Sequence, residues 1–236
     1  RVRSSAASDV YKRQKGYPEL FYCEGSTISL KGSTTRKIAF ERTSKQHVRI
    51  SQNTVKDSVL VEKMLMNKQN FKSAKDVDGF VPQASGLYCI RIKNVHLLPE
   101  PFGTILLERG HDILYIGIAS ENLYNRFLNQ ELRAKGHGTF FRSMGAVLGY
   151  KPPKGSLIEK RNKKNYKFSK TDELKIIGWI NENLMVNWVE SAGDLDSLET
   201  SLIVKYLPLL NLSKNPAALQ ILSYLRKECV EIANRN

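Results

Sequence analysis

A glutamate lies within an apolar helical face in the C-terminal half of the chain. Residues 195–206 have helical periodicity, and Glu199 falls in the middle of the apolar face. The apolar residues of that face are Leu195, Leu198, Leu202, Ile203 and Tyr206. An inward carboxylate needs a cation, because burial of an unpaired charge is costly or forces protonation. The cation can be an arginine, a lysine or a metal ion, and the helix alone slightly favours a salt bridge.

A second helical pattern, residues 122–135, places anion-binding side chains opposite an apolar stripe. The apolar stripe consists of Leu123, Phe127, Leu128 and Leu132. The opposite face carries Asn122, Arg126, Asn129 and Arg133. Arg and Asn donate hydrogen bonds to phosphate oxygens, and the planar guanidinium binds them in a bidentate way that Lys cannot match. A solvated outer face is the alternative interpretation of this stripe.

Two further basic regions are candidates for contact with a nucleic-acid backbone. The first follows the 122–135 helix and contains Arg133, Lys135 and Arg142. The second is the run 160–170, which mixes basic side chains that bind phosphates with aromatic ones that stack on bases. Its expected contact residues are Arg161, Lys163, Lys164, Tyr166 and Lys167, with Phe168 beside them. Solvated loops are the alternative for both regions, and the overall charge favours contact for the second.

The composition favours a polyanionic partner. The chain has 236 residues, with 37 Lys and Arg against 23 Asp and Glu, for a formal net charge of +14. Such an excess makes nucleic acid the first partner to consider, although a binding protein without enzymatic activity has the same charge. No apolar run is long enough to span a bilayer, so no membrane role is expected. Three cysteines without CxxC pairing favour a reducing, cytoplasmic location.

The elements that must position these residues predict an α+β fold. Strands are expected at 86–92, 113–118 and 185–190, because these stretches are apolar and partly alternating. Helices are expected at 122–135, 171–183, 195–206 and 216–233. This order predicts a small central three-stranded, mainly antiparallel sheet flanked by helices, with a small N-terminal module beside it.

The N-terminal part is expected to contain three segments. Residues 1–14 have no initiator Met and are similar to a translated sequencing-adapter tail, so we expect a non-native leader. Residues 15–71 contain short β-like pieces and a helical pattern, and we expect a separate module there. Residues 72–84 are polar, with Gly and Pro, and predict a linker.

Five short elements together resemble the GIY-YIG nuclease family. In chain order they are Gly86-Leu87-Tyr88, Tyr115-Ile116-Gly117, Arg126, Glu199 and Asn211. Each element alone is weak, whereas five in the right order and structural context are specific. The resemblance covers a nuclease-like domain at 85–212, with insertions at 93–111 and 150–170 and a C-terminal helix at 213–236. The departures from the family pattern are Leu in place of Ile in the first motif and the long connection between the two tyrosine motifs.

The resemblance implies a metal-dependent endonuclease that hydrolyses phosphodiester bonds, with DNA as the preferred substrate and water as the nucleophile. Glu199 would hold one divalent ion, Mg²⁺ or Mn²⁺. Arg126 would bind the scissile phosphate. Tyr88 and Tyr115 would flank the phosphorus, with Tyr88 the better candidate to take a proton from water. Asn211 would orient the framework by hydrogen bonds.

Three questions stay open at this level. A tyrosine with a pKa near ~10 needs nearby positive charge to act as a base; His137, in a Gly-His-Gly segment, is a candidate helper, and a loop histidine without a role is an equal alternative. A nucleic-acid-binding protein that keeps the fold without cutting is the rival function, although the retained Arg126 and Glu199 favour the enzyme. The module at 15–71 is a hypothetical target-recognition element.

Overall fold

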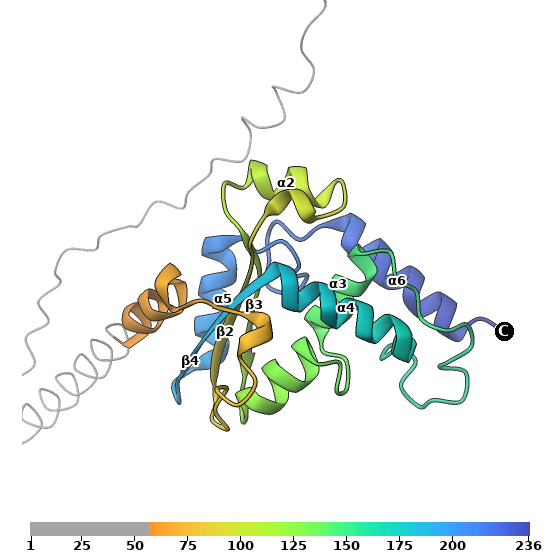
Figure 1. The fold of residues 1–236 in the computed structure, drawn as a ribbon, viewed down its shortest axis with the longest axis horizontal. Helices are drawn as coiled ribbons and strands as arrows, with labels where there is room; N and C mark the ends of the chain where they lie inside the picture. The colour runs from red at the N-terminus through yellow and green to blue at the C-terminus, as the bar shows by residue number, and fades with distance from the viewer. Residues whose placement is uncertain (1–56) are drawn as a thin grey trace, which may run out of the picture. The chain divides into compact units, whose positions relative to one another are not determined.

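The computed structural model describes residues 57–236. The leader expected at 1–14 and most of the module expected at 15–71 lie outside the described residues. Within them the chain forms an α+β body built on an antiparallel sheet (Figure 1). Of the described helices, none is long and apolar enough to cross a membrane.

The sheet has four strands instead of the three expected. In spatial order they are β1 (Lys72–Ser73), β4 (Leu184–Glu190), β2 (Gly86–Ile92) and β3 (Ile113–Ala119), and all neighbours are antiparallel. The additional strand, β1, contains two residues, which is too short for any alternation to be visible in the sequence. The three longer strands match the predicted ones to within one residue at each end.

Helices cover both faces of the sheet, which explains why β2 and β3 are buried almost throughout. On one face lie the π-helix η4 (Tyr124–Leu132), α3 (Thr139–Val147) and α4 (Lys170–Asn183), and α6 (Gln220–Asn234) packs on α3 (Figure 1). On the other face lie α5 (Leu195–Tyr206) and the helical residues 57–66. The sheet is therefore the middle layer of three.

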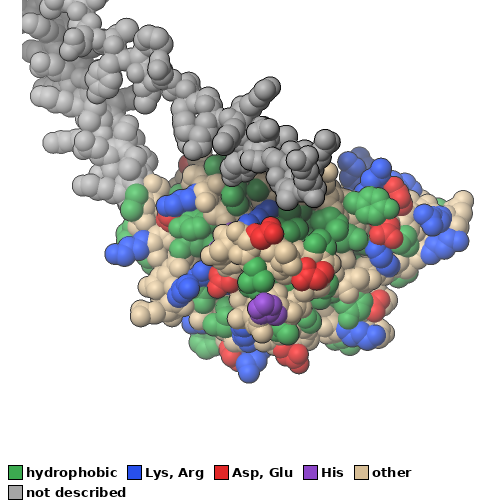
Figure 2. Space-filling view, turned by 90° about the horizontal axis from the view of Figure 1, so that it is seen from above, with side chains coloured by type: hydrophobic (Ala, Val, Ile, Leu, Met, Phe, Trp, Pro, Cys, Tyr) green, Lys and Arg blue, Asp and Glu red, His purple; other side chains and the backbone are tan. Residues whose placement is uncertain are grey.

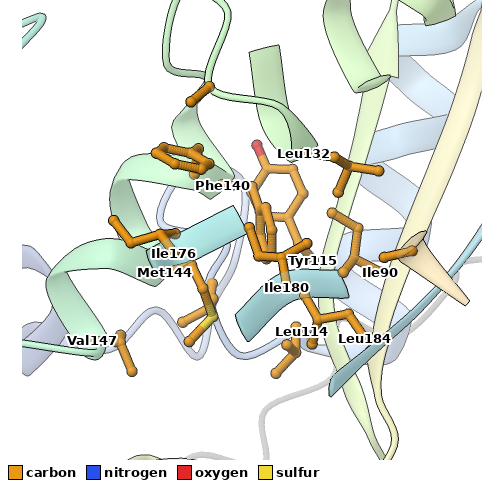
Figure 3. Packing of buried hydrophobic residues seen from close by; sticks show 14 of the residues in the cluster. Ile90, Leu114, Tyr115, Leu132, Phe140, Met144, Val147, Ile176, Ile180 and Leu184 are labelled. Carbon is orange, nitrogen blue, oxygen red and sulfur yellow. The ribbon is translucent and has the colours of Figure 1, made fainter. Parts of the chain in front are cut away.

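The larger core fills the space between the sheet and η4, α3 and α4. Figure 3 shows the ring of Tyr115 pointing from β3 into this core, close to Leu132, Phe140 and Ile180. Its hydroxyl lies at the edge of the cluster, away from Leu184. A tyrosine held in this way has a fixed ring and a polar end that can face a cleft.

The stretch expected to be a linker, 72–84, is part of this body. It contains β1 and the 3-10 helix η2 (Ala74–Asp76), after η1 (Lys68–Asn70), and its apolar residues enter the core. Ala74 and Val77 are fully buried because they lie on one side of an otherwise polar segment. The linker prediction was wrong because it weighed the polar composition and not the spacing of these apolar residues.

The segment 57–71 also packs on this body, although the sequence placed it in the separate module. Leu65 is fully buried in the core on the α5 side of the sheet. Asn187 on β4 donates from Nδ2 to the carbonyl oxygens of Met64 and Leu65, each at 2.9 Å. Glu62 accepts from the Tyr206 hydroxyl at 2.6 Å. A boundary at residue 71 therefore cuts through a packed interface.

The insertion at 93–111 forms a 3-10 turn, η3 (Val95–Leu97), and a short helix, α2 (Phe102–Glu108). Phe102 and Leu106 are buried in the larger core. At the end of α2 the Arg109 guanidinium donates to three carbonyl oxygens, those of Leu207 and Ala217, both at 2.6 Å, and that of Pro208 at 3.2 Å. The insertion thereby holds the segment that follows α5.

Candidate active site

A cleft lies at the β3 edge of the sheet, between η4 and α5. Its walls include Tyr88 and Tyr115 from the strands, Arg126 and Gln130 from η4, and Glu199 from α5. The cleft has a volume of about 520 Å³, within the range of sites that hold small ligands. Elements separated by more than a hundred residues thus bring both tyrosines, the arginine and the glutamate to one place.

The glycine of the second tyrosine motif explains how both rings fit. Tyr88 pairs with Gly117 in the β2–β3 register, and a Cβ on Gly117 would lie 2.5 Å from Tyr88 Oη and 2.8 Å from Tyr115 Cε1. The two ring centroids are 6.2 Å apart. The long connection therefore does not separate the motifs, because the insertion leaves the β2–β3 hairpin intact.

Both tyrosines are far from being ready bases. Burial, reinforced by the nearby carboxylate of Glu131, raises the pKa of Tyr88 well above its ordinary value. Burial and Glu131 likewise raise the pKa of Tyr115. Arg126 lowers both pKa values but does not offset the burial. Arg126 thus supplies the positive charge that a basic tyrosine requires, but burial has the larger effect on both pKa values.

Arg126 is held by a carboxylate that the sequence analysis missed. Its Nη1 lies 2.6 Å from Oε1 of Glu131 and 3.3 Å from Oε1 of Gln130. Glu131 is fully buried, whereas the side chain of Arg126 remains 32% exposed. The pair is five residues apart, and in η4 a spacing of five brings residues to the same side because this helix has the i→i+5 pattern of a π-helix.

Glu199 faces the cleft and has a lysine partner. Its Oε2 lies 2.8 Å from Lys214 Nζ, and Lys214 also pairs with Asp196 one turn earlier. No described side chain hydrogen-bonds to Glu199 Oε1. The carboxylate is only partly enclosed, with 13% of its side chain exposed. The cation that Glu199 was expected to need is thus a lysine here, and one carboxylate oxygen stays available to the cleft.

Asn211 fixes the edge strand on which the second tyrosine motif lies. Its Nδ2 donates to the carbonyl of Ile116 at 2.8 Å, and its Oδ1 accepts from the Ile116 amide at 3.0 Å. The preceding residues, Leu209 and Leu210, donate to the carbonyls of Ile113 and Leu114. Asn211 is buried, so its side chain acts on the position of β3 and not on a ligand.

His137 lies outside the cleft, in an apolar enclosure. Its ring meets Phe141 edge-on at 4.9 Å and Phe168 at 5.9 Å, and its Nε2 is 3.3 Å from Glu173. Burial lowers the pKa of His137 to about 4 despite Glu173. A neutral imidazole among aromatic rings has a structural role, so the structure does not support the expected help to a tyrosine.

The predicted nucleic-acid contacts near η4 divide into two groups. Asn122 lines the cleft beside Arg126. Asn129 and Arg133 face a separate hollow, and the Arg133 guanidinium is bonded to Asp78 at 2.9 Å and to Asn181 Oδ1 at 3.1 Å. Arg133 therefore ties 72–84 to η4 and α4, which accounts for its position without a ligand.

The insertion at 150–170 also differs from the expectation. Tyr166 and Phe168 are buried in the core, so they cannot stack on bases as predicted. Arg142 is 9% exposed, and its guanidinium lies over the Tyr166 ring. Four basic residues of this insertion are exposed, namely Arg161, Lys163, Lys164 and Lys167, and Lys163 Nζ donates to the carbonyl oxygens of Leu157 and Ile158. The aromatic side chains were misassigned because the residues that bury them come from elements distant in the sequence.

The face of the molecule that Figure 2 shows carries side chains of both charges. On the face that Figure 2 shows, Lys and Arg side chains alternate with acidic and apolar ones and are denser toward the end where α6 lies. No continuous basic track is visible on the part of this face that the described residues form. A more specific candidate for phosphate binding is Arg126, which lies in the wall of the cleft.

The carboxylates in the cleft wall are the groups of the cleft that could take part in holding a metal ion. In residues 57–236 no group of three or more His, Cys, Asp or Glu side chains could hold a metal ion. Mg²⁺ keeps several waters and often binds through one or two carboxylates plus substrate phosphates, so Glu199 with its available Oε1 could contribute to such a site without forming one by itself. Glu121 is a second carboxylate in the cleft wall.

The comparisons with known proteins agree with this geometry. The family model for the GIY-YIG catalytic domain matches residues 86–228, which include all five motif elements and most of α6. No curated protein and no solved structure matches the chain.

Proposed function

The chain belongs to the GIY-YIG catalytic domain family, and from this premise we propose that it is a metal-dependent endonuclease that hydrolyses phosphodiester bonds in DNA with water as the nucleophile. The observation that carries the proposal is the cleft in which Tyr88, Tyr115, Arg126 and Glu199 meet. Membership of the family indicates nuclease activity, and the substrate and metal dependence are our inference.

In this proposal Glu199, whose Oε1 has no side-chain partner among the described residues, would hold one Mg²⁺ or Mn²⁺ ion. The chemistry that such an ion supplies when bound is stabilisation of negative charge on the scissile phosphate and on the leaving oxygen. Lys214, which pairs with Glu199 Oε2, would compete with such an ion for the charge of the same carboxylate.

Arg126 binds the phosphate with the part of its guanidinium that Glu131 leaves free. Glu131 holds Nη1, while the exposed remainder faces the cleft. A guanidinium fixed at one end loses little conformational entropy on binding and stabilises the charge that develops in the transition state. Tyr88 and Tyr115 flank this position, and Asn211 keeps β3 in place.

The proposal is tested with supercoiled plasmid, Mg²⁺ or Mn²⁺, and an EDTA control. We expect the wild-type protein to nick the plasmid only with metal, and Glu199→Ala to abolish nicking. The matched control is Glu108→Ala, which removes an exposed glutamate from α2 and should cut like wild type. Arg126→Ala should cost about 10²–10³-fold in rate.

The rival function predicts a different pattern. A protein that binds nucleic acid without cutting would retain the plasmid in a salt-sensitive complex, with or without Glu199, and would produce no nicks with either metal. Equal cutting by wild type and Glu199→Ala would reject the assignment of the metal to Glu199.

A further inference from the structure

Glu131 is a buried carboxylate with no place in the reaction described so far. It is fully buried and receives three kinds of donor. Its Oε1 lies 2.6 Å from Arg126 Nη1 and 3.4 Å from Tyr88 Oη, and its Oε2 accepts from the Phe141 amide at 3.2 Å. A side chain so placed connects the phosphate-binding arginine directly to the candidate proton acceptor.

The fold is built around this carboxylate. The Phe141 amide belongs to the first turn of α3, so Glu131 caps the N-terminus of that helix, where an anion is stabilised. Gly138 precedes the helix, and a Cβ there would lie 2.0 Å from Glu131 Oε2. The carboxylate therefore reaches the helix terminus only because residue 138 has no side chain.

The hydrogen bond from Tyr88 has a consequence for the direction of proton transfer. A neutral tyrosine that donates its proton to Glu131 has its oxygen lone pairs free for another donor. Tyr88 lies in the wall of the cleft and is fully buried in this structure, so a water at the phosphate becomes that donor only when the wall moves enough to admit it to the hydroxyl oxygen. A distance of 3.4 Å is long for such a bond, but catalytic hydrogen bonds often shorten when the substrate is bound.

We propose that Glu131 is the final proton acceptor of the cleft and that Tyr88 acts as a relay between it and the attacking water. This proposal rests on the proposed nuclease function. In one step the water O–H bond breaks as the oxygen attacks phosphorus, the Tyr88 hydroxyl takes that proton, and the proton that Tyr88 already carried passes to Glu131 Oε1. No free tyrosinate forms.

The relay resolves the obstacle that burial imposes. Because burial raises the pKa of Tyr88 well above its ordinary value, an ionised Tyr88 is not available at neutral pH. Burial also raises the pKa of Glu131, which makes the carboxylate a better acceptor, while Arg126 and the helix amides oppose that rise. The other charged or titratable groups that act on Glu131 are Tyr115 from β3 and Arg142 from α3.

The charge of Arg126 stays balanced throughout this step. Before the attack, Arg126 faces the negative charge of Glu131. As Glu131 takes the proton, negative charge grows on the phosphate oxygens that the same guanidinium binds, so the arginine exchanges one anionic partner for another. This exchange is a reason for the arginine and the carboxylate to touch each other and not merely to share the cleft.

The test compares nicking rates of wild type, Glu131→Gln, Tyr88→Phe and the double variant with Mg²⁺, from mildly acidic to alkaline pH. We expect Glu131→Gln to lose about 10²–10⁴-fold at neutral pH, the usual contribution of a proton acceptor. Its remaining activity should rise about tenfold per pH unit, because Tyr88 or the water must then ionise unaided. The wild-type rate should be nearly independent of pH around neutrality, and the double variant should be no slower than the slower single variant.

The control variant is Glu173→Gln, which removes another buried carboxylate, paired with Lys170, outside the cleft. It should keep the wild-type rate and pH profile, and thermal unfolding of both glutamine variants reports any loss of folding. A slowed Glu131→Gln protein that keeps the wild-type pH profile, with losses that multiply in the double variant, would overturn the relay and leave Glu131 as a support for Arg126. A wild-type protein that cuts nothing rejects the proposed function instead, and the relay with it.

Discussion

Gly117 packs so closely against Tyr88 that an added methyl group should disturb the cleft. In Gly117→Ala the new Cβ would lie 2.5 Å from Tyr88 Oη and 2.6 Å from its Cζ, well inside ordinary van der Waals contact. The Tyr88 ring must move by roughly 1 Å, and a displacement of that size at a reacting group costs about 10²-fold in rate. Tyr88 stacks on Phe127 with centroids 4.7 Å apart, so the ring has little room to move.

The same substitution should also destabilise the fold. Overpacking a filled core costs about 1–3 kcal/mol, and a chain of this size loses about 2–4 °C in Tm for each kcal/mol. Rates come from plasmid nicking, and stabilities from thermal unfolding. The matched control is Gly178→Ala on α4, where an added Cβ meets no atom within 4 Å. That change should leave cutting intact and raise stability by about 0.5–1 kcal/mol, because a helical glycine is replaced.

A Gly117→Ala protein with the rate and Tm of wild type would refute the reasoning, because it would show that Tyr88 is not held against β3. Loss of activity with an unchanged Tm would keep the displacement of the ring but reject the overpacking cost.

Three further predictions concern the residues around the cleft. Burial lowers the pKa of His137 to about 4. Between about pH 6.5 and pH 4 the histidine is therefore protonated in the unfolded chain and neutral in the folded one. The free energy of unfolding should therefore be highest above about pH 6.5 and fall by roughly 3 kcal/mol as the pH drops toward 4. Urea unfolding of His137→Gln should show a flatter pH dependence, and its cutting rate should equal that of wild type. Lys214→Met should tighten Mn²⁺ binding to the free protein by about tenfold, or ~1.4 kcal/mol, because Glu199 loses its competing cation. Unchanged Mn²⁺ affinity in a titration would show that Lys214 does not compete with the metal. Asn211→Leu leaves the buried amide and carbonyl of Ile116 without the partners that Asn211 provides. Urea unfolding should then show a free energy of unfolding lower by about 2–5 kcal/mol, and a variant as stable as wild type would contradict this role of Asn211.

Most of the architecture could be predicted from periodicity. The strands β2, β3 and β4 and the helices α4 and α5 follow alternating or helical apolar patterns, and the structure has them nearly where they were expected. β1 could not be recognised, because a pair of residues has no period. The π-helical form of η4 was equally hidden, since apolar positions at 3.6 spacing do not distinguish it from an α-helix.

The residues of the site that belong to a sequence motif could be predicted. Tyr88, Tyr115, Arg126 and Glu199 were all named, and the structure brings them together. The carboxylate of Glu131 was overlooked although the sequence carries its signal: Leu123, Phe127 and Glu131 are four residues apart, so the argument that identified Glu199 also places Glu131 on an inward face.

Other partners of the site depend on tertiary structure alone. Lys214 meets Glu199 from a segment beyond α5, and the buried ring of Tyr166 lies beside Arg142 and Arg226, which belong to α3 and α6. No local pattern reports such encounters. The interpretation of 160–170 as a stacking surface failed for this reason.

The three carbonyls bound by Arg109 limit how this domain can be recombined. The insertion at 93–111 and the segment 207–217 share these hydrogen bonds, and the latter carries Asn211 and Lys214. A chimera that exchanges only the insertion would leave those carbonyls exposed to solvent competition and loosen the residue that holds β3. Variation in one segment is therefore constrained by the other, so the two should change together during evolution, and a laboratory exchange should transfer both as one unit.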